Sequence, residues 1–443
     1  MTAAALLDRA SSALEAARPV RVGRVRRVLG LTFEVDGVDA AIGDAIRVGP
    51  PERPMLGEVV AIGPDGIVAM PLGELHGLRA GDPVEATGGS LRVPVGQELL
   101  GRVLDGLGSP IDEGPSLAAS ERVALNGEPP HPLRRPTVDT PLHLGVRVLD
   151  TMVPVGRGQR IGIMAGSGVG KSSLLSMIVR GTDADVSVLA LIGERGREVR
   201  EFIERDLGPE GMARSVVVVA TSDAPALVRL KAAFAATRIA EWFRDQGAHV
   251  NLLMDSLTRF SMAQREIGLS AGEVPATRGY PPSVFALMPR LLERAGASEH
   301  GSITGIYTVL VEGDDLNDPI GDTSRSILDG HIALSRRLAS AGHFPTVDVL
   351  ESVSRVAPAV TTPDQQALVT RVRALLAAHR EAKDLIEIGA YQPGSNPLVD
   401  EAVARHGAIE AFLRQGLDEP SLPGEAWQEL ADALGCGNGV DGS

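Results

Sequence analysis

The middle of the chain alternates short, strongly apolar runs with longer amphipathic stretches. The apolar runs at residues 186–192, 215–220, 250–254 and 303–311 predict buried strands. Amphipathic segments at 224–246 and 258–267 are predicted to be helices. Apolar strands that alternate with helices are typical of a parallel sheet covered on both faces. This region is therefore predicted to be an α/β fold.

The stretch before it, residues 20–93, consists of short β-like runs separated by turn signals such as Asp36-Gly37 and Gly88-Gly89. Closely spaced strands of this kind predict a small β-barrel that leaves no open edge. Four arginines lie in its first run: Arg21, Arg24, Arg26 and Arg27. We interpret them as the solvent face of a strand; the alternative is a basic strip for an acidic partner or an anionic lipid.

The two ends of the chain have helical patterns. Residues 4–17 carry one apolar face, which is expected either to pack on its own domain or to bind a partner. From about residue 364 onward the pattern is again helical, with Leu368, Val372, Leu375 and Leu376 on one stripe. The proline-rich segment 128–136 is predicted to be a stiff connection, and residues 436–443 are predicted to be disordered.

Composition narrows the classes of function. A chain of 443 residues is expected to form two or three domains. Its 43 Lys and Arg against 57 Asp and Glu give a formal charge of −14, and only 13 residues are aromatic (8 Phe, 3 Tyr, 2 Trp), so a nucleic-acid-binding face is disfavoured. The single Cys436 cannot form an internal disulfide, which agrees with a reducing compartment. The start lacks the apolar region of a signal peptide, and no apolar run approaches a membrane span.

The stretch RIGIMAGSGVGKSS at residues 160–173 predicts a strand that leads into a phosphate-binding loop and a helix. Lys171 is expected to meet the β- and γ-phosphates, and the Ser172 hydroxyl to hold magnesium. Ala165 replaces the first Gly of the motif, at the position that closes the strand. A glycine-rich turn with a chance Lys-Ser pair is the alternative, and the flanking patterns disfavour it. The predicted nucleotide-binding residues of the loop are Gly166, Ser167, Gly168, Val169, Gly170, Lys171, Ser172 and Ser173.

Two carboxylates follow predicted strands. Asp255 ends the apolar run that begins at Asn251, where a magnesium partner for Ser172 is expected. Glu194 follows the run at 186–192, at the strand end where ligands of open α/β sheets gather, and is a candidate to polarise the attacking water. A solvated charged turn is the other interpretation of Glu194, and spacing alone leaves both open.

Five blocks together resemble the catalytic ATPases of flagellar and type III protein export, which are similar to rotary ATP synthase subunits. In chain order they are PVGQELLGRVLDGLGSPID, GVRVLDTMVPVGRGQRIGIMAGSGVGKSS, LIGERGREVREF, GDTSRSILDGHIALSRRLA and FPTVDVLESVSRV. The resemblance implies an N-terminal β-barrel, a RecA-like nucleotide domain and a C-terminal helical domain. It implies domains at residues 19–94, 95–362 and 363–435, after a regulator-binding helix at 1–18 and before a tail at 436–443.

The resemblance also assigns roles. Glu194 matches the catalytic glutamate, with Arg195 as a charged neighbour in the same block. Arg355 matches the arginine finger that reaches the nucleotide of the adjacent subunit. Phe344 matches the residue that faces adenine, although without the family a core Phe is the default interpretation. Thr346 departs from the Ser, Ala or Pro more usual in the family, which affects loop packing rather than chemistry.

The expected function is ATP hydrolysis with Mg²⁺ by a cytoplasmic homohexamer at the inner face of a flagellar export apparatus. The implied partners are a stator-like regulator, a central stalk, the export gate, substrates and chaperones, with peripheral membrane association left open. A virulence type III secretion ATPase is the first alternative, and a rotary synthase or V-type ring subunit is the second. A RecA-like translocase on nucleic acid is a third, and the acidic composition counts against it.

Overall fold

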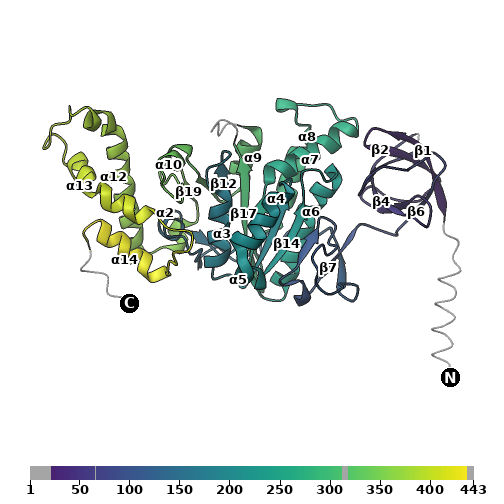
Figure 1. Ribbon diagram of the computed structural model, residues 1–443, viewed down its shortest axis with the longest axis horizontal. Coiled ribbons are helices and arrows are strands. Elements are labelled where there is room, and N and C mark those ends of the chain that lie inside the picture. The colour runs from purple at the N-terminus through teal and green to yellow at the C-terminus, as the bar shows by residue number, and fades with distance from the viewer. Residues whose placement is uncertain (1–20, 65, 312–317, 437–443) are drawn as a thin grey trace, which may run out of the picture. The chain divides into compact units, whose positions relative to one another are not determined.

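The computed structural model describes residues 21–64, 66–311 and 318–436 (Figure 1). Two compact units divide the chain: residues up to 91 with 267–273, and residues 92–266 with 274–443. The helix predicted at 4–17 and the tail from 437 lie outside the described residues. Among the residues that the structure describes, no helix is long and apolar enough to cross a membrane.

The first unit contains a closed six-stranded barrel in the order β1-β2-β5-β4-β3-β6. Its strands are β1 (Val22–Leu29), β2 (Thr32–Asp36), β3 (Ala45–Val48), β4 (Met55–Gly63), β5 (Gly66–Pro71) and β6 (Pro83–Ala86). All neighbours pair antiparallel, and alternate side chains fill a core around Phe33 and Ile46. The predicted barrel is confirmed.

The arginines of the first run lie on the exposed face of the barrel. Arg21, Arg24, Arg26 and Arg27 are all exposed. Arg26 and Arg27 form ion pairs with Glu34 on the neighbouring strand, at 3.0 and 3.1 Å. This agrees with the solvent-face interpretation.

The second unit is built on a nine-stranded sheet in the order β19-β18-β12-β17-β15-β13-β14-β8, with β16 beside β17. From β18 to β8 all neighbours are parallel, whereas β19 and β16 pair antiparallel. The strands are β8 (Val103–Asp105), β12 (Arg160–Ala165), β13 (Val186–Ile192), β14 (Ser215–Ala220), β15 (His249–Asp255), β16 (Gly296–Ala297), β17 (Ser302–Leu310), β18 (Gly330–Ala333) and β19 (Val353–Ser354). The predicted parallel α/β sheet is confirmed by this pairing, and β13 and β14 are buried along their whole length.

Helices connect these strands, and α5, α6 and α9 among them pack against the sheet. They are α2 (Arg147–Met152), α3 (Lys171–Gly181), α4 (Gly196–Glu201), a π-helix (Phe202–Leu207), α5 (Gly208–Ala213), α6 (Ala226–Asp245), α7 (Leu257–Ser270), α8 (Pro282–Leu292), α9 (Pro319–Ile327), α10 (Arg336–Ser340) and α11 (Ala357–Val360). Smaller elements are β7 (Arg92–Val95) paired with β9 (Glu121–Ala124), β10 (Pro141–Leu142) paired with β11 (Val155–Gly156), and 3-10 turns Gln97–Leu99 and Thr277–Gly279. The longest of these helices, α6, packs on β13, β14 and β15.

Three helices follow the sheet: α12 (Pro363–Glu387), α13 (Pro397–Leu413) and α14 (Pro423–Ala433). Each has proline in its first turn, where a backbone N–H would have no intrahelical acceptor, so the absence of that N–H costs no hydrogen bond. Thr362 and Gln365 form a reciprocal capping box at the start of α12. Val372 and Leu375 are buried, with Leu368 and Leu376 packed against the same core, so the predicted apolar stripe is confirmed.

Candidate active site

The loop between β12 and α3 has the backbone of an anion cradle. Gly168 and Gly170 have φ of +73° and +86°, the left-handed region that favours glycine. Gly170 is the N-cap of α3, and no side chain caps that helix, so its first N–H groups are available to a phosphate. The helix begins at Lys171, as predicted. Ser167 and Ser172 are exposed, Gly166 and Val169 are buried, and Ser173 is half-buried.

Residues 344–346 lie against this loop. The Thr346 hydroxyl, which is buried, donates to the carbonyl oxygen of Val169 at 2.6 Å. A Cβ added at Gly170 would lie 3.4 Å from the Phe344 ring. Phe344 is 46% exposed, so it is not a core residue, and its ring borders the nucleotide loop. Thr346 therefore holds the loop backbone in place, a contact that sequence reasoning described only as loop packing.

Lys171 joins the two predicted carboxylates. Its Nζ lies 2.5 Å from Asp255 Oδ1 and 3.4 Å from Glu194 Oε1. Burial lowers the pKa of Lys171, but the charges of Asp255 and Glu194 more than offset burial, so the pKa lies above its ordinary value. The ammonium ion is therefore secured at neutral pH at the carboxyl end of the sheet.

Glu194 lies two residues beyond β13 and is half-buried. Burial raises its pKa above the ordinary value, and the nearby charge of Asp255 and a hydrogen bond with Glu198 act in the same direction, against the opposing charge of Lys171. A carboxylate with a raised pKa is a better proton acceptor than an exposed one. Glu194 thus has the environment of a general base.

Two residues near these carboxylates were not predicted from the sequence. Thr308 on β17 is fully buried, and its hydroxyl donates to Asp255 Oδ1 at 2.7 Å. Arg259 on α7 packs its aliphatic carbons against Gly193, where an added Cβ would lie 2.9 Å away. Both contacts depend on which strands and helices are neighbours in the fold. The apolar patterns of the strands do not determine this order.

The structure does not bring the predicted arginines to this cluster. Arg195 Nη1 pairs with Glu198 at 3.1 Å on the surface. Arg355 follows β19, and its Nη2 donates to the Arg325 carbonyl at 3.2 Å. Within the described part of the chain, neither guanidinium contacts Lys171, Glu194 or Asp255.

Magnesium would find oxygen donors here. The Ser172 hydroxyl and the Asp255 carboxylate are the hard ligands that this ion prefers. No three His, Cys, Asp or Glu side chains gather to hold a metal in the residues that the structure describes. The site therefore fits an ion that takes most of its ligands from phosphates and water.

Comparison with known proteins finds matches over most of the chain. Residues 145–354 match the nucleotide-binding domain of the ATP synthase alpha/beta family, residues 25–88 match the β-barrel domain of that family, and residues 361–432 match the C-terminal domain of the T3SS EscN ATPase. The "Flagellum-specific ATP synthase" of Bacillus subtilis is 52% identical over 418 residues, covering 94% of this chain and 95% of that protein. The "Type 3 secretion system ATPase" of Xanthomonas euvesicatoria is 50% identical over 403 residues, covering 90% and 91%.

Among solved structures, the assembled ATPase EscN from the enteropathogenic E. coli type III secretion system has the same fold. Solved as the assembled ATPase and in complex with its central stalk EscO, it matches with TM-scores of 0.89 and 0.86 at 44% identity, covering 93% of this chain and 100% of that chain. The predicted three-part architecture is confirmed.

Proposed function

Because this chain belongs to the family of flagellum-specific ATP synthases and type III secretion ATPases, we propose that it hydrolyses ATP to energise flagellar protein export. One observation carries the chemical part of this proposal: Lys171, Glu194 and Asp255 meet at the carboxyl end of the sheet, beside the loop and the free N-terminus of α3. A lysine, a base and an acidic metal partner in this place suit phosphoryl transfer.

In the proposed reaction, the α3 N-terminus and Lys171 bind the β- and γ-phosphates, and the Phe344 ring borders the base. Glu194 orients a water and accepts its proton as the water oxygen bonds to the γ-phosphorus. The bond between that phosphorus and the β–γ bridging oxygen breaks, releasing ADP and phosphate. Asp255 is released from Lys171 once the phosphates take over the lysine, and Thr308 keeps its carboxylate oriented.

Magnesium, held through Ser172 and Asp255, would neutralise charge on the phosphates. The chain's own task is to present these two oxygens on the same side of the loop. Ser172 suits this role because its side chain is exposed, at the second residue of α3.

Arg355 is proposed to complete the site of the neighbouring subunit in a homohexameric ring. The position of Arg355, away from the Lys171 cluster of its own chain, supports a role in trans. An arginine supplied this way contributes about 10³–10⁵ to turnover. We expect Arg355→Ala to retain nucleotide binding and to lose turnover by about that factor, as measured by ADP titration and phosphate release. Lys171→Ala is the contrasting variant, because it is expected to lose both.

A mixing experiment tests the trans role directly. Arg355→Ala chains keep Glu194, and Glu194→Gln chains keep Arg355, so roughly a quarter of interfaces in an equal mixture are complete. Each variant alone is expected to be nearly inactive and the mixture to regain activity. Mixed oligomers that stay inactive at every ratio would contradict the proposal, as would full turnover in a stable monomer.

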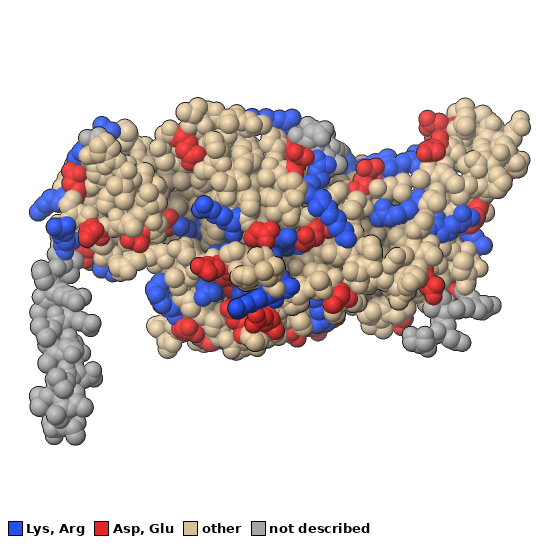
Figure 2. Space-filling model, turned by 180° about the vertical axis from the view of Figure 1, so that it is seen from behind, with Lys and Arg blue, Asp and Glu red and all other residues tan. Residues whose placement is uncertain are grey.

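The export role and its partners rest on the relatives. EscN in complex with its central stalk EscO supports a ring and a stalk partner for this chain. We further propose a position at the inner face of the membrane, contact with the export gate, substrates and chaperones, and a regulator at residues 1–18. Acidic and basic side chains are interspersed over the face in Figure 2, which agrees with the disfavoured nucleic-acid role. RNA is expected not to stimulate ATPase activity.

The flagellar branch is preferred over virulence secretion, although relatives of both kinds are close to 50% identical. Deleting the gene and scoring motility and secreted proteins separates them. Loss of filament proteins from the medium supports the flagellar role, whereas normal motility with loss of other secreted proteins supports the virulence alternative.

A further inference from the structure

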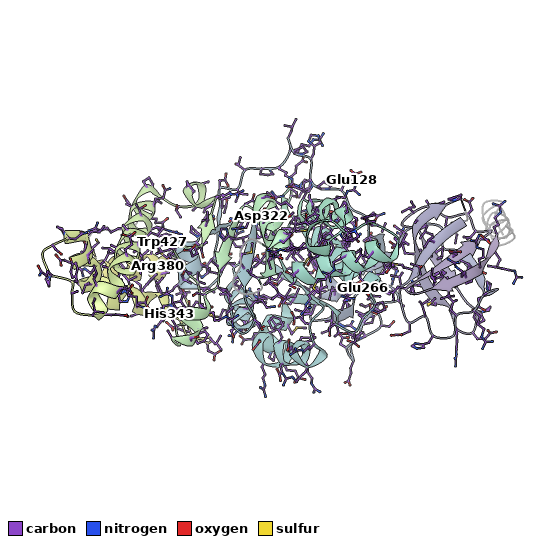
Figure 3. All side chains as sticks on the ribbon, turned by 90° about the horizontal axis from the view of Figure 1, so that it is seen from above. Glu128, Glu266, Asp322, His343, Arg380 and Trp427 are labelled. Atoms are coloured by element: carbon purple, nitrogen blue, oxygen red, sulfur yellow. The ribbon has the colours of Figure 1, made fainter. Side chains whose placement is uncertain are left out.

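A cavity of about 200 Å³ lies between residues 337–350 and helices α12 and α13, away from the nucleotide loop. It has room for roughly six water molecules. His343 and Arg380, both on its wall, are labelled in Figure 3. Its charged and titratable lining residues are Arg337, His343, Asp348, His379, Arg380, Lys383, His406, Glu410 and Arg414.

The carboxylates of the cavity are already engaged. Asp348 accepts from Arg380 at 2.8 Å and from the backbone N–H of Leu350. Glu410 pairs with His343 at 2.9 Å, and this contact lowers the pKa of Glu410. The charges of His406 and Arg414 lower the pKa of Glu410 further, and the arginines and lysine of the lining outnumber these two acids.

Two arginines in the lining have no such partner. The guanidinium groups of Arg337 and Arg414 are exposed and make no hydrogen bond or ion pair within residues 21–64, 66–311 and 318–436. They reach the cavity from different elements, α10 and the end of α13. Lys383 adds a third cation, paired only at 3.5 Å with Glu387 on the surface.

Two histidines complete the wall. His379 on α12 and His406 on α13 stack with ring centroids 3.7 Å apart and an interplanar angle of 12°. Nδ1 of His406 is shielded from solvent and has no hydrogen-bond partner in the described chain. An unsatisfied buried nitrogen is costly unless a ligand or a water serves it.

We propose that this cavity binds a small dianion of the phosphate class, held by Arg337, Arg414 and the stacked histidines. Guanidinium groups suit tetrahedral oxyanions because they donate two parallel hydrogen bonds. Val347, Leu376 and Leu413 supply the apolar part of the lining. The site is separate from the nucleotide site, since Lys171 and residues 166–173 do not line it.

Binding of a dianion here is expected to depend on pH. Burial and the neighbouring His406 lower the pKa of His379, which favours the neutral form of its ring. A bound dianion stabilises the protonated ring, so by linkage the ion binds more tightly as the pH falls. Sulfate is the better probe for this dependence, because phosphate itself gains a proton near pH 6.

Isothermal titration of the full-length Lys171→Ala protein with sulfate and with pyrophosphate tests the proposal. That background weakens the nucleotide loop, so the remaining site is measured. We expect one ion per chain, and at least about tenfold weaker binding in Arg337→Gln/Arg414→Gln. Both arginines are exposed and unpaired, so the variant should fold normally. Arg290→Gln removes another exposed arginine and is the matched control, expected to bind like its parent.

Sulfate affinity is expected to rise by about tenfold from pH 8 to pH 6, and His379→Asn/His406→Asn to abolish that rise. Competition by ADP for the same site would identify a nucleotide phosphate as the source of the ion. Binding of pyrophosphate without ADP competition would identify a free inorganic anion. Absence of binding at millimolar ion, or equal affinity in Arg337→Gln/Arg414→Gln, overturns the proposal.

Discussion

In the described active site, the charged side chain of Lys171 is paired with carboxylates of the same chain. Lys171 is shared between Asp255 and Glu194 at 2.5 and 3.4 Å, so its charge is satisfied before any nucleotide binds. An incoming phosphate must displace these contacts. Part of the binding energy of ATP is therefore used to rearrange the lysine and free both carboxylates for the reaction.

Glu194→Gln tests the proposed role of Glu194 as general base without changing the shape of the side chain. The amide keeps the size of the side chain but cannot accept the water's proton, so turnover is expected to fall by about 10²–10⁴. Nucleotide affinity should stay equal or rise, because one negative charge near the phosphates is removed. Phosphate release and ADP titration measure the two effects. A variant with near-normal turnover would show that another group activates the water.

Among single residues, the sequence predicted the loop and both carboxylates because each stands at a recognisable strand end. It did not predict the hydrogen bonds made by Thr308 and Thr346. Thr308 meets Asp255 only because β17 lies beside β15, with Tyr307 opposite Met254. Buried parallel strands are apolar on both faces, so their sequences do not reveal which neighbour or register they take.

At the level of elements, a buried ion pair joins α6 to the chain after α8. Arg294 Nε and Nη2 lie 2.6 and 2.7 Å from the two oxygens of Glu241, and both side chains are almost fully buried. Arg294 also donates to the Leu125 carbonyl at 3.1 Å. Three separate segments therefore meet at one bidentate pair.

Breaking this pair from one side should be costly. We expect Glu241→Leu to lower the free energy of unfolding by about 3–5 kcal/mol, because Arg294 is left buried without its counter-charge. Glu241→Leu/Arg294→Met should recover most of that loss. Urea unfolding of the three proteins measures it. If the double variant is as unstable as the single one, the loss comes from packing and not from charge.

Element bounds followed closely from the sequence where burial was complete. The strands predicted at 186–192 and 215–220 have those bounds, while the helix predicted at 258–267 extends over Leu257–Ser270. The block GRVLDGLGSPID contributed to the family resemblance, and it also has a structural role that was not predicted from the sequence. Arg102 donates two hydrogen bonds to the carboxylate of Asp112, and this interaction lowers the pKa of Asp112 to about 2.

At the scale of the whole molecule, the C-terminal helices share one hydrophobic core with the sheet, and a half-buried histidine lies near their junction. His143 Nδ1 is 2.9 Å from Asp150, and its Nε2 is 2.8 Å from the Ser421 carbonyl. Both neighbours are acceptors, and a neutral imidazole has only one N–H. These two contacts favour the protonated imidazole while the segment before α14 is docked.

The contacts of His143 predict a pH dependence of stability. Burial lowers the pKa of His143, but Asp150 and the Ser421 carbonyl raise it to a net value above the ordinary one; burial also raises the pKa of Asp150. Raised pKa values stabilise the folded state below the unfolded value, about 6.5 for His, and that stability is lost as the pH rises through the folded value. His143→Gln is expected to cost about 2 kcal/mol at pH 6 and less at pH 8.

Chemical unfolding of both proteins across this range measures the difference. A cost that does not change with pH would mean that His143 acts through packing alone.

This junction could not be predicted from the sequence, because His143 and Ser421 are far apart in the chain and neither belongs to a motif. The proposed ring was likewise inferred from the relatives and from the position of Arg355, because the sequence of one chain does not reveal how copies of it assemble.

The secured ammonium of Lys171 also bears on chemical labelling. This chain has only three lysines, Lys171, Lys231 and Lys383, among its 43 basic residues. Acylating reagents attack the free amine, and the raised pKa of Lys171 leaves less of that form than an ordinary lysine has. Amine-directed probes and cross-linkers should therefore mark Lys383, on the wall of the cavity between α12 and α13, well before the nucleotide site.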